Sequence, residues 1–281
     1  MKERIAVVTG ANRGIGRAIA EGLARADYRT IMVCRKREDG ERAMEEIASR
    51  TGNHSLEVMG ADLSSLAQVR RVGDDIIARH PAIQVLVNNA AVARKRREES
   101  ADGIELTLAV NHLAAFELTR TLLPALQRGA PARVVTVASA AQRRKQVVLD
   151  DLQNVGRRYG GVRVYGETKL MNVLFTKELA RRTAGTGVTV TCCHPGVIGT
   201  DGLVNYFPRL LRPFVAAFTG TTERGADTPV WLATSPEVQG ASGGYYIRRR
   251  LAKPNRRADD VQLARGLWEA SEDLVSRGAR A

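Results

Sequence analysis

The sequence predicts a single α/β domain in which helices cover both faces of a doubly wound sheet of about seven mostly parallel strands. Two observations support this prediction: short apolar runs alternate with helical patterns along the chain, and no linker or low-complexity segment interrupts the alternation. A chain of 281 residues, of which 44% are hydrophobic, can bury one large core. We therefore expect one domain spanning residues 1–281.

The expected elements follow one another as repeated βα units. Each strand is a short apolar run of the kind that parallel sheets bury on both faces. In chain order, the expected strands are Ile5–Val8, Thr30–Cys34, Leu56–Met59, Val85–Asn88, Arg133–Ser139, Val188–Cys192 and Gly244–Ile247. The expected helices between them are Gly14–Ala26, Glu38–Ser49, Leu66–Arg79, Ile104–Gln127 and Tyr165–Arg182.

The chain is strongly basic, with a formal charge of +13 and a pI near 10.3. Basic clusters occur at residues 94–97, 143–145 and 248–250. Because no aromatic residues are interleaved with them, as a base-stacking surface requires, we interpret them as solvated faces or loops and expect no nucleic-acid partner. A bulky anionic substrate remains an alternative.

Cysteine usage indicates a reducing compartment. The three cysteines are an odd number, and the adjacent pair Cys192 and Cys193 is poorly placed for a structural disulfide. We therefore expect a cytoplasmic protein, without a signal peptide or a membrane span. The four histidines lack acidic or cysteine partners at ligand spacing, so no metal site is expected.

A glycine-rich turn connects the first expected strand to the first helix. Gly10, Gly14 and Gly16 leave room for backbone N–H groups and the positive helix end to meet the pyrophosphate of a dinucleotide, as in Rossmann-type folds. The glycine pattern by itself is weak, and a flexible turn explains it as well. Its position between a strand and a helix favours the dinucleotide.

A tyrosine and a lysine lie four positions apart, at Tyr165 and Lys169, with Ser139 upstream at the end of an apolar run. Positions i and i+4 share one helix face, so the ammonium of Lys169 can lower the pKa of the Tyr165 phenol. Ser139 and Tyr165 can then hydrogen-bond a carbonyl oxygen while Tyr165 transfers the proton. This combination indicates nicotinamide-dependent redox chemistry.

These motifs together resemble the short-chain dehydrogenase/reductase family. The Gly-x-x-x-Gly-x-Gly spacing differs from the Gly-x-Gly-x-x-Gly of other Rossmann dehydrogenases, and the remaining motifs occur in the order of the family. They are Asp62-Leu63, Asn88–Ala91, Asn111, Ser139, Tyr165, Lys169 and Pro195-Gly196. The family pattern is altered at two positions, where Ala91 replaces a glycine and Thr168 replaces a serine.

Further segments are similar to the retinol dehydrogenase-like branch of that family. The segment between Ser139 and Tyr165 is about twice as long as in ordinary bacterial carbonyl reductases, which marks residues 140–164 as an insertion. The segments that carry the similarity are Leu149–Leu152, Tyr165–Phe175, His194–Val197 and Ala264–Glu269. Microsomal members of the branch carry an N-terminal hydrophobic anchor that this sequence lacks, so membrane residence is not implied.

The resemblance implies a role for each matching residue. Ser139, Tyr165, Lys169 and Asn111 are the implied catalytic residues, with Lys169 also binding the nicotinamide ribose and Asn111 holding a water that links Lys169 to solvent. The implied cofactor-binding residues are Gly10, Asn12, Arg13, Gly14, Ile15, Gly16, Arg35, Asp62, Leu63, Asn89, Tyr165, Lys169, Pro195, Val197 and Thr200. Two of these assignments have structural alternatives, because Asp62 is also a good helix N-cap and Asn111 can be a surface residue.

The cofactor preference is predicted from the end of the second strand. Arg35-Lys36 stands where an acidic residue would bind the ribose hydroxyls of NAD, and Arg13 adds another cation. We therefore expect NADPH or NADP+, with NADH the weaker candidate. Surface arginines in an arginine-rich chain are the alternative explanation.

The expected function is NADP(H)-dependent interconversion of a carbonyl and an alcohol on a hydrophobic small molecule. Apolar residues recur with roughly helical period over residues 201–221, which predicts a substrate-covering segment, although a core helix explains the same pattern. The insertion is expected to form another wall of the site. A catalytically silent NADP(H)-binding scaffold or sensor is the alternative function. Because family members often pair through their long central helices, we expect a homodimer or homotetramer.

Overall fold

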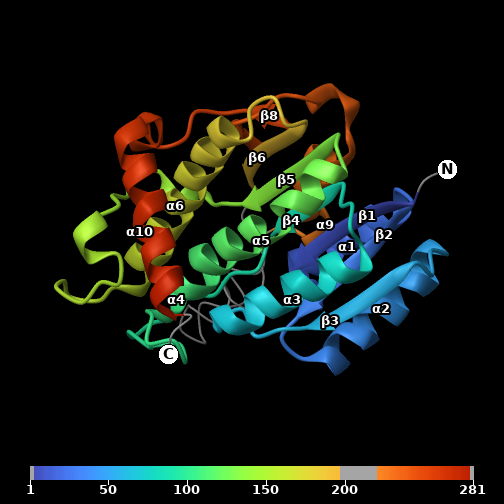
Figure 1. Cartoon of the computed structure of the whole chain (residues 1–281), viewed down its shortest axis with the longest axis horizontal. Helices are drawn as coiled ribbons and strands as arrows, with labels where there is room; N and C mark the ends of the chain where they lie inside the picture. The colour runs from blue at the N-terminus through green and yellow to red at the C-terminus, as the bar shows by residue number, and fades with distance from the viewer. Residues whose placement is uncertain (1–2, 197–219, 279–281) are drawn as a thin grey trace.

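A central parallel sheet organises the chain in a computed structural model that describes residues 3–196 and 220–278 (Figure 1). Its strand order is β3-β2-β1-β4-β5-β6-β7-β8. The strands are β1 (Arg4–Thr9), β2 (Tyr28–Cys34), β3 (Leu56–Gly60), β4 (Val85–Asn88), β5 (Ala132–Val137), β6 (Val188–His194), β7 (Tyr245–Ile247) and β8 (Arg250–Leu251). Every neighbouring pair is parallel except β7 and β8.

The predicted fold class is confirmed. The seven expected strands are present, and β8 adds a short antiparallel strand at the edge of the sheet. Because β8 has only two residues and is exposed, it carries no hydrophobic pattern that the sequence could have revealed.

Helices cover both faces of this sheet (Figure 1). On one face, α3, α5 and α6 pack against the strands and α10 packs outside them; on the other face lie α1, α2 and α9. The helices are α1 (Gly14–Arg25), α2 (Arg37–Thr51), α3 (Leu66–Arg79), α4 (Leu106–Leu108), α5 (Ala114–Arg128), α6 (Gly161–Arg182), α9 (Thr222–Thr234) and α10 (Val261–Gly278). The sequence did not predict α9 or α10.

The helix expected over Ile104–Gln127 is interrupted. Between α4 and α5 the chain forms a π-helical turn, Ala109–Leu113, which contains Asn111. The Asn111 side chain both donates to and accepts from the backbone of Val92, at 2.9 and 2.7 Å. The wider turn thus carries an asparagine bound to the loop after β4, a long-range contact that periodicity cannot reveal.

The parallel register brings the carboxyl ends of the strands to one edge of the sheet. Val137 pairs with Cys193, Cys193 pairs with Tyr246, and His194 pairs with Ile247. The residues that follow β5, β6 and β7 therefore lie side by side. This edge collects Ser139 and the Pro195-Gly196 turn, and open α/β sheets bind ligands at such an edge.

Helix α10 covers the outer surface of the two long central helices. Its Trp268 stacks on Phe175 of α6, with centroids 5.9 Å apart, and meets Phe116 of α5 edge-on at 4.9 Å. The Arg182 guanidinium lies 4.2 Å from the Trp268 ring. A substantial part of the surface through which subunits were expected to pair is therefore packed within the chain, and the homo-oligomer stays a prediction.

Within the described ranges, no helix combines the length and apolarity needed to cross a bilayer.

Candidate active site

The glycine turn after β1 forms a cradle for an anionic group. Gly10 and Gly14 have φ values of 65° and 56°, in the left-handed region that side chains disfavour. A Cβ on Gly16 would overlap the carbonyl oxygen of Gly10 and lie 2.5 Å from Nδ2 of Asn89. Helix α1 begins at Gly14 with neither a side-chain cap from Arg13 nor an acidic residue in its first turn. Its free N–H groups and this close backbone packing fit a pyrophosphate.

Two residues from neighbouring strands hold the glycine turn in place. Asn89, directly after β4, donates from Nδ2 to the carbonyl of Thr9 at 2.9 Å, and the backbone N–H groups of Asn89 and Ala90 donate to Oγ1 of Thr9. Asn89 thus lies against the turn, where the sequence expected it. The sequence analysis missed Thr9, whose polar hydroxyl directly before the turn was the available signal.

The expected adenosine end of the site lies beside β2 and β3. Arg35 follows β2 and is exposed at the same edge as the glycine turn. Asp62 follows β3, where its carboxylate accepts from the N–H and the hydroxyl of Ser64, at 2.9 and 2.7 Å. The N-cap of α3 is Ser65, so the capping alternative for Asp62 is wrong. Leu63 beside it is half-buried.

Ser139 and Tyr165 meet at the carboxyl edge of the sheet. Ser139 follows β5 and caps a short 3₁₀ turn, accepting from the N–H of Ala141 at 3.2 Å. Tyr165 lies in the second turn of α6, because this helix begins at Gly161 and not at Tyr165 as predicted. Burial raises the pKa of Tyr165, while a side-chain hydrogen bond with Ser139 lowers it. The two hydroxyls that the sequence proposed as partners are therefore together.

Lys169 lies beneath this pair, almost completely buried. Its Nζ atom donates to the carbonyl of Val137 at 2.8 Å and lies 5.6 Å from the centre of the Tyr165 ring. Burial lowers the pKa of Lys169 from 10.5 to about 8. At neutral pH the ammonium is thus largely retained, at a cost in stability. That this charge lowers the pKa of Tyr165 stays a prediction, since burial and Ser139 are the influences found here.

Asn111 connects the loop after β4 to the catalytic helix. Besides binding Val92, its Nδ2 atom donates to Oγ1 of Thr168 at 3.1 Å, and that hydroxyl donates to the carbonyl of Tyr165 at 2.8 Å. Asn111 is 1% exposed, so the surface alternative is wrong. These contacts occupy the side-chain amide, and the water-holding role of Asn111 stays a prediction. Thr168, noted only as a departure from the family pattern, has this linking role.

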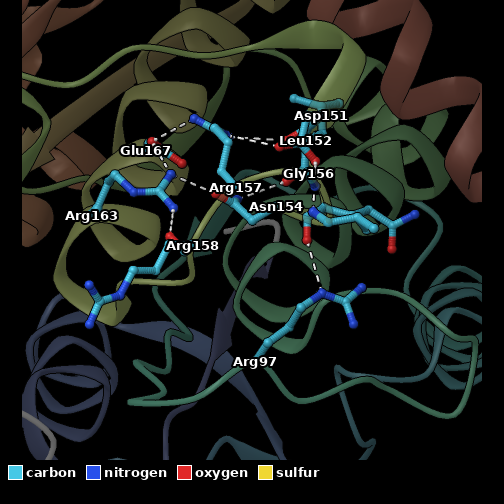
Figure 2. Close-up of polar contacts among 11 residues, drawn as sticks. Arg97, Asp151, Leu152, Asn154, Gly156, Arg157, Arg158, Arg163 and Glu167 are labelled. Atoms are coloured by element: carbon cyan, nitrogen blue, oxygen red, sulfur yellow. Dashed lines mark hydrogen bonds and ion pairs between the residues drawn. The ribbon is translucent and has the colours of Figure 1, made fainter.

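The insertion between Ser139 and Tyr165 is tied to α6 by charged side chains (Figure 2). Glu167, buried midway between Tyr165 and Lys169, accepts from Arg157 at 3.3 Å and from Arg163 at 2.9 Å. Arg157 also contacts Asp151 at 2.9 Å. Because the buried carboxylate is paired twice, its desolvation is offset. The insertion therefore braces the catalytic helix; its role as a substrate wall stays a prediction.

The remaining predicted positions are only partly described. Pro195 follows β6 and is half-buried, and Asn12 and Ile15 are half-buried in the glycine turn and in the first turn of α1. Val197, Thr200 and nearly all of the segment 201–221 lie outside the described residues.

Comparison with known proteins agrees with this geometry. A family model described as short chain dehydrogenase matches residues 4–209. The chain belongs to the short-chain dehydrogenase/reductase family. Family membership makes it an oxidoreductase that moves a hydride between a nicotinamide cofactor and an alcohol or carbonyl group.

Relatives with this fold extend over nearly the whole chain. Human retinol dehydrogenase 14 is 37% identical over 98% of this chain and 87% of its own length, and Dehydrogenase/reductase SDR family member 13 from Bos taurus is 37% identical over 99% and 74%. Among solved structures, an uncharacterized protein from Mycobacterium Paratuberculosis superposes with a TM-score of 0.78 at 33% identity, covering 97% of this chain and 93% of the other. The Pseudomonas aeruginosa RhlG/NADP complex gives a TM-score of 0.69 at 27% identity, covering 86% and 93%. The predicted resemblance to this family and to its retinol dehydrogenase-like branch is confirmed.

We predict that Gly16→Ala weakens NADPH binding by at least about tenfold, because the added methyl group displaces the Gly10 carbonyl and Asn89 from the cradle. Isothermal titration of purified protein with NADPH measures this. Gly156→Ala is the matched control, since its new Cβ would meet no atom closer than 3.7 Å. Equal affinity of the Gly16→Ala variant and the wild type would contradict the proposed cradle.

A second prediction concerns the buried ammonium. Lys169→Met should be more stable than the wild type at pH 7 by about 2 kcal/mol, the cost of burying the charge less one hydrogen bond. Below pH 8, Lys169 is charged in both the folded and the unfolded state, so the full cost opposes folding; above pH 10.5 it is neutral in both. The advantage of the variant should therefore shrink as the pH rises from 8 to 10.5. Urea unfolding at pH 7 and pH 10 tests this, and a variant less stable at pH 7 would refute it.

Proposed function

We propose that this protein is an NADP(H)-dependent enzyme that interconverts the carbonyl and alcohol forms of a largely apolar small molecule. The observation that carries the proposal is the meeting of Ser139 and Tyr165 above buried Lys169, at the same sheet edge as the glycine cradle. A silent scaffold would have no need to retain a buried ammonium that opposes folding. The scaffold alternative therefore has no observation in its favour.

Each residue has a distinct part in the proposed reaction. NADPH, when bound, supplies the hydride. Ser139 and Tyr165 donate hydrogen bonds to the substrate oxygen, where negative charge develops during reduction. Burial raises the pKa of Tyr165, so the phenol is protonated at neutral pH and can donate its proton. Lys169 stabilises the tyrosinate that remains.

The preference for NADP(H) rests on the charges around the expected 2′-phosphate. Arg35 is exposed directly after β2, the position from which an acidic residue would favour NAD. Arg13, at the N-cap of α1, is also exposed. A guanidinium binds phosphate with two parallel hydrogen bonds. The structural relative RhlG was solved with NADP, which agrees with this preference.

The other features of the proposal come from the sequence. The apolar pattern over residues 201–221 supports a hydrophobic substrate, with the insertion at residues 140–164 as a second wall. A cytoplasmic location is proposed because Cys34, Cys192 and Cys193 are all unpaired and buried. Assembly as a homodimer or homotetramer is retained as a proposal.

We predict that Tyr165→Phe lowers kcat for reduction of a medium-chain aldehyde by at least about a hundredfold, because the proton donor is lost. NADPH affinity should change less than about twofold, since the ring remains in place. Stopped-flow NADPH consumption and fluorescence titration measure the two quantities. Tyr28→Phe in β2 is the matched control and should keep full activity. A Tyr165→Phe enzyme with normal kcat would exclude Tyr165 as the proton donor, whereas tight binding without turnover in the wild type would support the scaffold.

We predict that Arg35→Asp lowers the NADPH/NADH ratio of kcat/KM by at least about tenfold, because repulsion replaces attraction at the 2′-phosphate. Steady-state kinetics with each cofactor measure this ratio. Arg71→Asp makes the same charge change on an exposed residue of α3 and should leave the ratio unaltered. An unchanged ratio in Arg35→Asp would reject the phosphate contact.

A further inference from the structure

Two arginines lie at the active-site edge of the sheet. The register pairs Val137 of β5 with Cys193 of β6, and Cys193 with Tyr246 of β7. Ser139 lies two residues after Val137 and Arg248 two residues after Tyr246, so both lie at the same edge of the sheet. Neighbouring strands are about 4.8 Å apart, and β6 lies between β5 and β7. The backbone of Arg248 therefore lies about 10 Å from that of Ser139. Arg143 ends the 3₁₀ turn that Ser139 caps. The two guanidinium groups therefore come from segments that border the reacting hydroxyls.

Both arginines are near His194, which lies between them on β6. Burial lowers the pKa of His194, and the charges of Arg143 and Arg248 lower it further. The Nδ1 atom of His194 is buried and has no hydrogen-bond partner in the described part of the chain. An anion placed here would therefore meet two cations, with a neutral imidazole between them.

No acidic group offsets these two charges within the residues that the structure describes. Both side chains are exposed, and neither makes an ion pair or a side-chain hydrogen bond there. Unpaired cations by themselves are expected in a chain with a net charge of +13. The basic loop at residues 94–97, in contrast, pairs Arg94 with Glu98 at 3.3 Å and Arg97 with Glu99 at 2.6 Å.

The backbone that presents Arg248 is strained. Arg248 and Arg249 have φ values of 50° and 59° in the two-residue turn between β7 and β8, where asparagine and glycine are the favoured residues. Arg249 has a structural reason to be there, since it contacts Asp227 and its N–H donates to Thr228 at 3.2 Å. The turn accounts for the positive φ of Arg248, but within the described residues no contact accounts for an arginine there, and a residue held in a disfavoured conformation without a structural role is a candidate for function.

This cluster is far from the expected cofactor phosphate. Arg35 follows β2, and four strands, β1, β4, β5 and β6, separate β2 from β7. Five strand spacings place the two sites about 24 Å apart along the sheet. An anion bound beside Arg248 would therefore belong to the substrate and not to the adenosine half of the cofactor.

We propose that Arg143 and Arg248 bind a carboxylate of the substrate, so that the enzyme acts on amphipathic carbonyl compounds whose apolar chain carries an acid group away from the reacting carbon. A carboxylate matches the planar fork of a guanidinium and can accept from both arginines. This inference rests on the proposed carbonyl–alcohol chemistry and narrows its substrate class. The bulky anionic substrate considered from charge alone thereby gains a specific site.

The test compares two substrates that differ only in charge, a medium-chain ω-oxo carboxylic acid and its methyl ester, with NADPH. The wild type should show a kcat/KM for the acid at least about tenfold above that for the ester. Arg248→Asn suits the left-handed backbone and so preserves the hairpin. Arg248→Asn and Arg143→Gln should each lower kcat/KM for the acid by at least about tenfold, mainly by raising KM. Each variant should change kcat/KM for the ester by less than about twofold. Arg250→Asn removes the same charge from the same hairpin and should leave both values unaltered.

Equal kcat/KM for acid and ester in the wild type, or equal losses on both substrates in the variants, would overturn the carboxylate site while leaving the carbonyl reductase activity intact. If neither substrate is reduced, calorimetric titration with decanoate decides. Binding by the wild type that Arg248→Asn weakens at least about tenfold would support the site even though the proposed activity had failed. Absence of decanoate binding would overturn the site.

Discussion

The hydrogen bond from the buried Lys169 ammonium to the carbonyl of Val137 is the interaction on which the site depends. It joins the catalytic helix to the end of β5, two residues before Ser139. Ser139 and Tyr165, the hydroxyls proposed to bind the substrate oxygen, come from these same two segments, so the bond helps to set their relative position. Burying an ammonium costs stability, and the lowered pKa of Lys169 is the sign of that cost. The surrounding sheet and helices must supply the compensating stability.

Other polar contacts support the same arrangement from outside. Asn111 holds the loop after β4 and reaches Thr168, which in turn binds the backbone of Tyr165. Glu167, next to Thr168, is paired with Arg163 one turn earlier in α6 and with Arg157 of the loop before the helix. Tyr165 and Lys169 are therefore held by contacts at two of the three residues between them, Glu167 and Thr168. Reacting groups fixed in this way need little reorganisation when charge develops on the substrate.

Much of this arrangement was predictable because it depends on local patterns. Alternating apolar runs identify seven strands of the sheet, and the glycine turn and the Tyr165–Lys169 spacing identify the two ends of the site. The π-helical turn at Asn111 and the start of α6 at Gly161 were not predicted, since both depend on contacts with distant residues. Helix α10, in contrast, was missed although the signal was available, since its buried residues Ala264, Leu267, Trp268 and Val275 recur with helical spacing.

The sequence by itself predicted the fold class, and it proposed the cofactor cradle and the reacting groups, because glycine conformation, strand periodicity and helical spacing are properties of short segments. Tertiary structure decided which side chains support them. It placed Thr9 beneath the glycine turn, buried Lys169 against Val137, and brought Arg143 and Arg248 to the edge that holds Ser139. These relations join residues far apart in the chain, and only the strand order and register of the folded sheet bring such residues together.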